Sequence, residues 1–78
     1  MKVLVHIMLK EGVLDPQGKA VEHALRGLGF AEASSVRLGR LVEMDVAGDT
    51  ATARERVDSM CRQLLANPVI ERYQIEVG

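Results

Sequence analysis

The sequence predicts an α+β protein with two helices on one face of a mostly antiparallel sheet. Three observations lead to this class. The elements follow one another as strand, helix, long strand, helix and strand; the strand segments alternate apolar and polar residues; and the helical segments carry apolar residues at helical spacing. With 78 residues, the chain is long enough for one domain, over 1–78, and too short for two.

Residues 2–10 are expected to form the first strand. One of its faces is lined by Val3, Val5, Ile7 and Leu9. Leu4 and Met8 make the opposite face apolar as well. Because a strand that is apolar on both faces has to be covered on both, we expect helices on one side and a further surface on the other.

Residues 16–28 are expected to form the first helix. Asp15 is a favoured N-cap, and Pro16 suits the first helical position because its missing N–H would have no helical partner there. An apolar stripe is formed by Ala20, Val21, Ala24, Leu25 and Leu28. Gln17 projects toward the N-terminal edge of that stripe, and Gly29 can adopt the left-handed conformation that ends a helix.

Residues 35–46 alternate cleanly and predict a second strand. Its apolar face is formed by Val36, Leu38, Val42, Met44 and Val46. Arg40 falls on that face directly after Gly39, which indicates a bulge or a bend. At about 3.3 Å per residue this strand would span roughly 40 Å, so it must bend at Gly39 or project past its own domain. A strand bent in two gives a ferredoxin-like order of elements, whereas a projecting half offers backbone hydrogen bonds to another chain.

A second helix, capped by Asp49 or Thr50, is expected over residues 51–66. Its buried stripe consists of Ala53, Val57, Met60, Cys61 and Leu64. The dipeptide Asn67-Pro68 ends it, because proline lacks the N–H donor and forces the preceding residue out of helical geometry. The last strand, 70–77, has Tyr73, Ile75 and Val77 on one face.

Charge and composition exclude several classes of partner. The formal net charge is −1, with acidic and basic residues interspersed, so there is no basic field for nucleic acid or for an anionic membrane surface. One tyrosine and one phenylalanine are too few for a base-stacking platform. The apolar run at the amino terminus is too short to span a bilayer, and we expect a cytoplasmic protein.

The size of the chain predicts self-association. A domain this small buries only about 60% of its unfolded surface and is usually reinforced. Cys61 is the only cysteine, which excludes an internal disulfide, and His6, His23 and Cys61 lack the paired spacing of a zinc site. We therefore expect a homo-oligomer, either a dimer or a dimer of dimers.

The residues that could carry chemistry form no catalytic constellation. Glycine and lysine near the start of the first helix could hold an anion, but the carboxylate of Asp15 would cap the same amides and repel a phosphate. His6 lies between apolar neighbours and is interpreted as a core or interface histidine. Cys61 lies in a buried stripe and is interpreted as an inert core thiol.

The charged residues of the second strand also have alternative interpretations. Glu43 and Asp45 could bind a divalent metal, although two acids on an exposed strand face more often serve solubility. Arg37 and Arg40 could grip a carboxylate or phosphate of a ligand. Because they flank Gly39, we favour a salt link across a subunit boundary, which makes these three residues the candidates for an oligomer interface.

Three stretches of the chain resemble the PurS family, the small subunits of bacterial phosphoribosylformylglycinamidine synthase. They are LKEGVLDPQGKAVEHAL, SVRLGRLVEM and MCRQLLANPVIERYQIEV, and the resemblance runs from about Val3 to Val77. The most specific motifs are Leu-Asp-Pro-Gln-Gly at 14–18 and Leu-Leu-Ala-Asn-Pro at 64–68. The chain departs from the family at Arg40-Leu41, where lysine and tyrosine are more usual.

The resemblance implies a role in de novo purine synthesis. The enzyme is a C–N ligase that uses glutamine as amide donor and converts formylglycinamide ribonucleotide to formylglycinamidine ribonucleotide. A glutaminase subunit releases ammonia, and a large synthetase subunit uses ATP and Mg. The small subunit is implied to be a dimer that bridges these two subunits and supports ammonia transfer, with no active site and no bound cofactor of its own.

Two corners of the chain are candidates for docking these partners. The first consists of Asp15, Pro16, Gln17 and Gly18, and the second of Asn67 and Pro68. The main alternative is a stand-alone regulatory module of ferredoxin-like shape that binds a small ligand between paired chains. A third possibility, an acyl-phosphate hydrolase of similar topology, would need an anion loop with an arginine and an asparagine beside it, which the sequence lacks.

Overall fold

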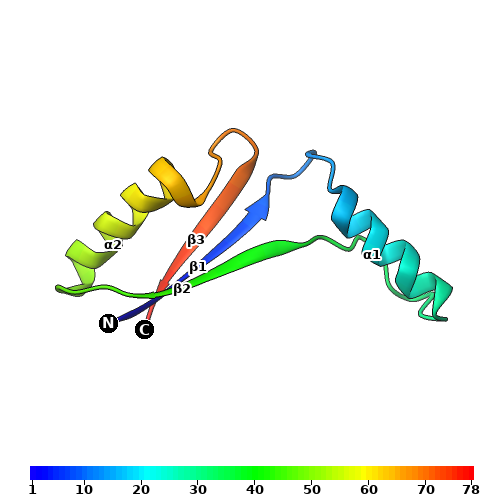
Figure 1. The fold of residues 1–78 in the computed structure, drawn as a ribbon, viewed down its shortest axis with the longest axis horizontal. Helices are drawn as coiled ribbons and strands as arrows, with labels where there is room; N and C mark the ends of the chain where they lie inside the picture. The colour runs from blue at the N-terminus through cyan, green and yellow to red at the C-terminus, as the bar shows by residue number, and fades with distance from the viewer.

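The structure, a computed structural model, describes residues 1–78 and has an elongated shape, with principal extents of 48 × 25 × 14 Å (Figure 1). The elements in chain order are β1 (Lys2–Leu9), α1 (Pro16–Gly27), β2 (Gly39–Asp45), α2 (Thr50–Met60), the π-helical turn η1 (Cys61–Leu65) and β3 (Glu71–Val77). The predicted α+β class and the predicted order of the elements are confirmed.

β1 is the central strand of a three-stranded antiparallel sheet with the order β2-β1-β3. Val5 pairs with Val42 of β2 and with Ile75 of β3. Because directly paired residues point to the same side of a sheet, this register places Val3, Val5 and Ile7 of β1 on one face with the alternating apolar residues of β2 and β3. The alternation predicted for the second and third strands therefore places their apolar residues on the same face of the sheet as Val3, Val5 and Ile7.

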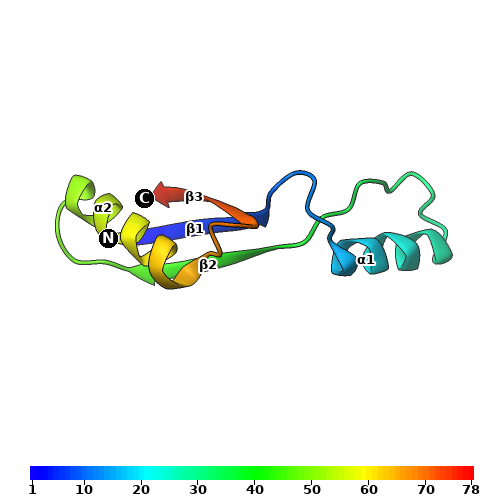
Figure 2. The same cartoon turned by 90° about the horizontal axis from the view of Figure 1, so that it is seen from above.

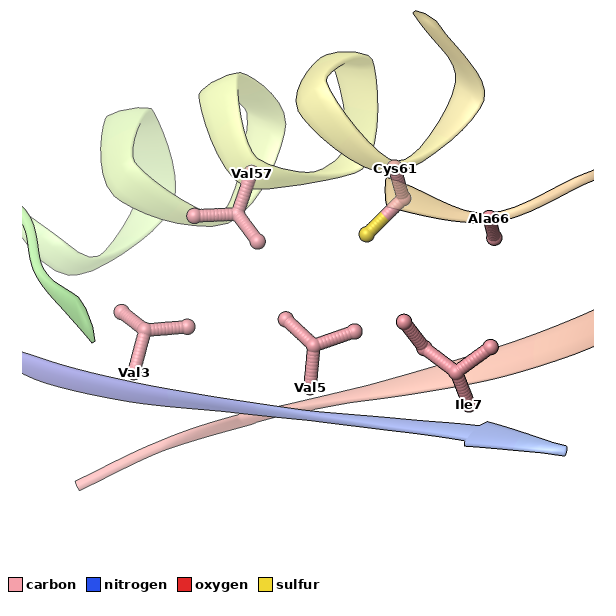
Figure 3. Packing of buried hydrophobic residues seen from close by; sticks show 6 residues of the cluster. All are labelled: Val3, Val5, Ile7, Val57, Cys61 and Ala66. Atoms are coloured by element: carbon pink, nitrogen blue, oxygen red, sulfur yellow. The ribbon is translucent and has the colours of Figure 1, made fainter. Parts of the chain in front are cut away.

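The core lies between this face and the continuous helix formed by α2 and η1 (Figure 3). Its buried cluster consists of Val3, Val5, Ile7, Val57, Cys61 and Ala66. The three side chains of β1 point directly at those of the helix. Fully burying a valine or isoleucine side chain stabilises a protein by about 1.5–3 kcal/mol, so each of the three valines and Ile7 carries a large share of this small core's contribution.

The π-helical turn η1 changes which residues of the second helix reach the sheet. Leu64, predicted to be buried, is 84% exposed, whereas Ala66 is buried. The N–H of Ala66 donates to the carbonyl of Cys61, five residues earlier, at 3.0 Å. A π turn holds more residues per turn than an α-helix, so it rotates the following side chains out of the 3.6-residue phase on which the prediction rested.

α1 begins and ends as the sequence predicts. Asp15 is its N-cap and Pro16 its first residue. At the C-terminal end Gly29 has φ +101°. The N–H of Phe30 donates to the carbonyl of Leu25 and that of Gly29 to Arg26, which is the hydrogen-bond pattern of a Schellman motif.

The prediction that both helices cover one face of the sheet is wrong for α1. Within this helix only Gly18 is buried, and Leu28 of the predicted apolar stripe is 74% exposed. Figure 2 shows α2 alongside the sheet and α1 beyond its end. The spacing of apolar residues identifies a face that needs cover, but it carries no information about which surface covers it.

The strand expected over 35–46 is regular only from Gly39 to Asp45. Residues 36–38 continue away from the sheet toward α1, so the segment projects rather than bending back (Figure 1). No fourth strand forms, and the ferredoxin-like order is not completed within one chain. The last pair of the β1–β2 ladder is Met8 with Gly39, and a Cβ on Gly39 would overlap the Met8 sulfur and lie 2.6 Å from the Ile7 carbonyl oxygen.

The second face of the sheet and the outer edge of β2 are uncovered in this chain. Leu41 is 59% exposed on that face. Met1 and Val46 exchange two backbone hydrogen bonds, both of 2.9 Å. In an antiparallel pair every second residue bonds to the neighbouring strand, so the N–H and C=O groups of Leu41 and Glu43 point away from β1, toward the open edge. The sequence predicts that both faces of β1 are covered, but a single chain covers only the face that packs on α2 and η1. No helix combines the length and apolarity needed to cross a bilayer.

Candidate association surface

The part of the chain that leaves the sheet has two pieces, which we name by their residues. The arm comprises residues 16–34, which form α1 and the loop after it. The neck comprises residues 10–15 and 35–38, the two segments that connect the arm to β1 and β2 (Figure 1). Exposed large apolar residues of the arm and neck are Leu14, Val21, Leu28, Phe30 and Leu38. Large exposed apolar side chains that form a contiguous patch mark contact surfaces, which makes the arm and neck candidates for one.

Asp15 connects the two segments of the neck. Its Oδ1 accepts the N–H of Gly18 at 2.8 Å, which caps α1, and its Oδ2 accepts the N–H of Leu38 at 2.9 Å. The residue is 8% exposed. The N–H of Gly18, then that of Leu38, together with the positive charge of Arg37, hold the pKa of this carboxyl below its ordinary value.

Two further side chains bridge the neck. Oε1 of Glu22 accepts the N–H of Val36 at 3.0 Å, and this bond lowers the pKa of Glu22. The guanidinium of Arg37 donates to the carbonyls of Lys10 and Val13, each at 3.2 Å. Arg37 therefore has partners in its own chain, and a cross-subunit salt link for it stays a prediction.

The candidate corner at 15–18 divides into buried and exposed halves. Asp15 and Gly18 are buried and shape the corner, whereas Pro16 and Gln17 are exposed and can meet a partner. Gln17 lines a hollow of about 190 Å³ at the base of the neck, opposite Arg40 and Glu71. The docking role proposed for this corner consequently concerns Pro16 and Gln17.

Arg40 sits at the end of the core face, paired with Ile7. Its guanidinium nitrogen lies 2.9 Å from both carboxylate oxygens of Glu71 and donates to the carbonyl of Leu65 at 3.1 Å. Glu71 also accepts the N–H of Asn67 at 2.7 Å, and that bond, followed by Arg40, lowers the pKa of Glu71. Arg40, like Arg37, thus has a structural role within the chain, and its predicted interface role remains a prediction.

The second candidate corner, Asn67 and Pro68, ends η1 and starts the turn into β3. Oδ1 of Asn67 accepts the N–H of Val69 at 3.1 Å, and the carbonyl of Pro68 accepts the ammonium of Lys10 at 2.8 Å. Leu64 and Val69, which lie on either side of this corner in the chain, are both exposed, so the segment presents apolar side chains. Sequence reasoning missed this surface, because Leu64 was assigned to the core and Val69 lies in a turn without periodicity.

Of the residues considered for catalysis or metal binding, Cys61, Glu43 and His6 are each buried or close to a charged side chain. Cys61 is buried, and burial raises the pKa of its thiol, which lowers its reactivity. Glu43 pairs with the ammonium of Lys2 at 2.6 Å. His6 lies on the uncovered face of the sheet, 3.6 Å from Glu76, so its interpretation as a core histidine is wrong, while an interface role stays a prediction.

Glu71 supplies a test of the Arg40 cluster. Replacing Glu71 by alanine removes the acceptor for both Asn67 and Arg40 at a mostly buried carboxylate, and we expect a loss of about 1–2 kcal/mol in the free energy of unfolding. Glu76→Ala, on the exposed side of the same strand, should change it by less than about 0.5 kcal/mol. Urea unfolding measures both, and equal midpoints for the two variants would contradict the assignment.

Four carboxylates with lowered pKa values predict acid sensitivity. They are Asp15, Glu22, Asp49 and Glu71, and each accepts a backbone N–H. A carboxyl whose pKa is lower in the folded state stabilises fully above its unfolded pKa, which is about 4. This stabilisation is lost as the pH falls through the lower folded-state value. Thermal unfolding measured from pH 6 downward should show Tm falling steeply below about pH 4; a Tm that rises on acidification would refute this.

The fold and the arm define a small α+β protein with an uncovered projecting helix, which is typical of a subunit that works in an assembly. The family model PurS, described as phosphoribosylformylglycinamidine (FGAM) synthase, matches residues 2–78. The chain belongs to the PurS family, and the predicted resemblance is confirmed. It is a subunit of phosphoribosylformylglycinamidine synthase, an enzyme of purine biosynthesis.

Individual relatives agree with this family. The chain is 46% identical over 76 residues to the phosphoribosylformylglycinamidine synthase subunit PurS of Bacillus subtilis, covering 97% of this chain and 90% of that one. The crystal structure of PurS from Methanocaldococcus jannaschii is similar at TM-score 0.91 and 39% identity, covering 99% and 94% of the two chains. A chain in the structure of PurLQS from Thermotoga maritima is similar at TM-score 0.87 and 30% identity, covering 96% and 93%.

Proposed function

We propose that the chain is a non-catalytic assembly subunit that holds the glutaminase and the large synthetase subunits together, so that ammonia passes between them. The observation that carries the proposal is the arm, whose apolar side chains are uncovered although side-chain hydrogen bonds hold its neck. The Thermotoga maritima relative supports it, because that structure contains PurL and PurQ with a PurS chain of the same fold.

We propose further that the arm is covered by a second copy of the chain. Each sheet lacks a fourth strand and a second helix. Each arm carries a helix with no sheet to cover, and the neck adds the extended segment 36–38. A twofold axis would let each arm lie on the other copy's sheet, because such a contact is self-complementary. Half-buried residues that could receive it lie on the core face of the outer strands: Val42, Met44, Tyr73 and Ile75.

ATP and Mg belong, in this proposal, to the synthetase subunit. A helix N-terminus is a common phosphate site, but at the start of α1 the Asp15 carboxylate already accepts the Gly18 N–H and would repel an anion there. The exposed acid Glu43 is neutralised by Lys2. We place the assembled enzyme, and this chain with it, in the cytoplasm.

Activity measured with two nitrogen sources tests the assembly role. Glutaminase and synthetase subunits are assayed with and without this chain, once with glutamine and once with saturating ammonium. Omitting the chain should lower the glutamine-dependent rate by about a hundredfold, because ammonia released by a separate glutaminase no longer reaches the synthetase at a high local concentration. The ammonium-dependent rate should change less than about twofold. An equal loss with both nitrogen sources would mean that the chain contributes to the chemistry and would refute the proposal.

Gln17 tests the docking corner. Gln17→Ala should weaken binding to the glutaminase or the synthetase by about tenfold, since it removes one exposed amide contact and leaves the capped helix intact. Gln63→Ala is the matched control, because Gln63 is also exposed and bonds only to Ser59 at 2.7 Å. Pull-down titrations give both affinities. If the two variants bind alike, the corner at 16–17 is not a docking site.

The alternative of a ligand-binding module predicts a different result. A regulatory ligand should raise the Tm of the isolated chain in a thermal-shift screen of amino acids and nucleotides. The assembly role predicts stabilisation by the partner subunits and by none of these small molecules.

A further inference from the structure

The neck lacks the hydrogen bonds that normally join neighbouring chain segments. No backbone–backbone hydrogen bond connects residues 10–15 with residues 35–38. The bonds between the two segments, or between α1 and the second segment, all come from side chains: Asp15, Glu22 and Arg37. The direction of the arm relative to the sheet therefore depends on these side chains and not on a ladder.

Asp15 is the buried member of this set. Its two oxygens bind N–H groups that are 20 residues apart in the chain, those of Gly18 and Leu38, so one side chain both starts α1 and ties it to the segment leading into β2. The contact is tight, because a Cβ on Gly18 would overlap the Val36 carbonyl oxygen and lie 2.8 Å from Oδ2 of Asp15. There is no space for the helix start to shift toward the strand.

The N-cap of α2 shows what a cap alone requires. Oδ1 of Asp49 accepts the N–H of Thr52 at 2.8 Å, and the residue is exposed with no bond to another segment. Serine caps helices as well as aspartate does, so capping alone does not need a second oxygen. The second oxygen of Asp15 is the one that reaches Leu38.

We propose that Asp15 is a positioning residue: by bonding Leu38 as well as Gly18, it fixes the direction of the arm and so presets the arm to fit its partner in the assembly. The inference rests on the proposed function, because the direction of the arm affects association only if the arm binds another chain. Asp15 itself is buried and does not meet the partner. Its effect on association is indirect, through α1.

Asp15→Ser separates the two roles of this side chain. One hydroxyl can still cap α1 at Gly18, but it has no second oxygen to reach Leu38. Asp49→Ser makes the same substitution at a cap with one bond and is the matched control. Far-UV circular dichroism should give the same helix content for both variants and the wild type.

Amide hydrogen exchange resolved by residue is the first readout. In Asp15→Ser the exchange of the Leu38 amide should speed up by about tenfold to a hundredfold, which corresponds to losing a hydrogen bond to a charged group. The Gly18 amide should change by less than about threefold. In Asp49→Ser neither amide should change. A Leu38 amide that exchanges at the wild-type rate in Asp15→Ser would overturn the proposal.

A second test uses only the wild-type protein: its amide proton resonances are followed as the pH is changed. The amide proton resonances of Gly18 and Leu38 should titrate together with one midpoint, below the usual value for aspartate, since both bind one carboxylate. The charged groups around it are Arg37 on the neck, Lys19 and Glu22 on α1, and the Arg40–Glu71 pair across the hollow. Separate midpoints for the two amides would contradict a shared carboxylate.

Association is the final readout, measured as the self-dissociation constant and as binding to the partner subunits. Asp15→Ser should weaken association by about tenfold or more, and Asp49→Ser by less than about twofold. If Leu38 loses protection while association is unchanged, the positioning role is wrong and the assembly function stands. If the wild type itself associates with nothing, the assembly function fails, whatever the amides show.

Discussion

Replacing Ile7 by alanine is expected to unfold most of the isolated protein at room temperature. Ile7 is 1% exposed and closes the end of the core nearest the neck, where it pairs with Arg40 of β2. Truncating a buried isoleucine to alanine costs about 2–5 kcal/mol, because it removes apolar contacts and leaves a cavity. A domain this small has a total stability of only a few kcal/mol, so one such loss consumes most of it.

Leu64→Ala is the control for this prediction. The sequence pattern assigns both residues to the core, but η1 turns Leu64 outward. Its truncation should change the free energy of unfolding by less than about 0.5 kcal/mol. Urea unfolding followed by circular dichroism, at one fixed protein concentration, compares the two variants. Equal losses would mean that the helix phase described for η1 is wrong.

Gly18→Ala is expected to disable the arm while the sheet stays folded. The new Cβ would overlap the carbonyl oxygen of Val36, a backbone atom that cannot rotate away, and crowd Asp15. The neck has to open, at a cost of about 1–3 kcal/mol, and the arm loses its direction. We expect self-association to weaken by about tenfold or more. The core should remain, because α1 contributes nothing to the buried cluster.

Gly27→Ala isolates the steric effect from the general effect of alanine in a helix. Gly27 lies in the same helix, and a Cβ there meets nothing within 4 Å. Alanine is the better helix former by about 1 kcal/mol, so this variant should be as stable as the wild type or slightly more stable. It should also associate normally. Should Gly18→Ala associate as well as Gly27→Ala, the neck does not control the arm.

Local chemistry made several elements predictable from the sequence. The Asp15 cap, the start at Pro16 and the left-handed Gly29 depend only on residues within a few positions, and all three are confirmed. The prediction that Val3, Val5 and Ile7 share one buried face of β1 is also confirmed, because successive side chains of a strand point to opposite faces. These features need no knowledge of distant parts of the chain.

Features that depend on distant contacts could not be predicted. The π turn at Cys61–Leu65 is joined through its last carbonyl to Arg40, 25 residues away, and it moved Leu64 out of the core. The cap at Asp15 was predictable, but its second bond to Leu38 spans 23 residues and has no local signal. The position of α1 was missed for a related reason: its apolar stripe calls for cover, and nothing in this chain provides it.

The oligomeric state in solution tests the central claim most directly, namely that the arm is a contact surface awaiting another chain. Sedimentation velocity should be recorded from nanomolar to high micromolar concentration. We predict a mass of at least two chains in the micromolar range, dissociating on dilution, with Gly18→Ala shifted toward the monomer. A single 8.5 kDa species at every concentration, which also fails to bind the glutaminase and synthetase subunits, would contradict the account.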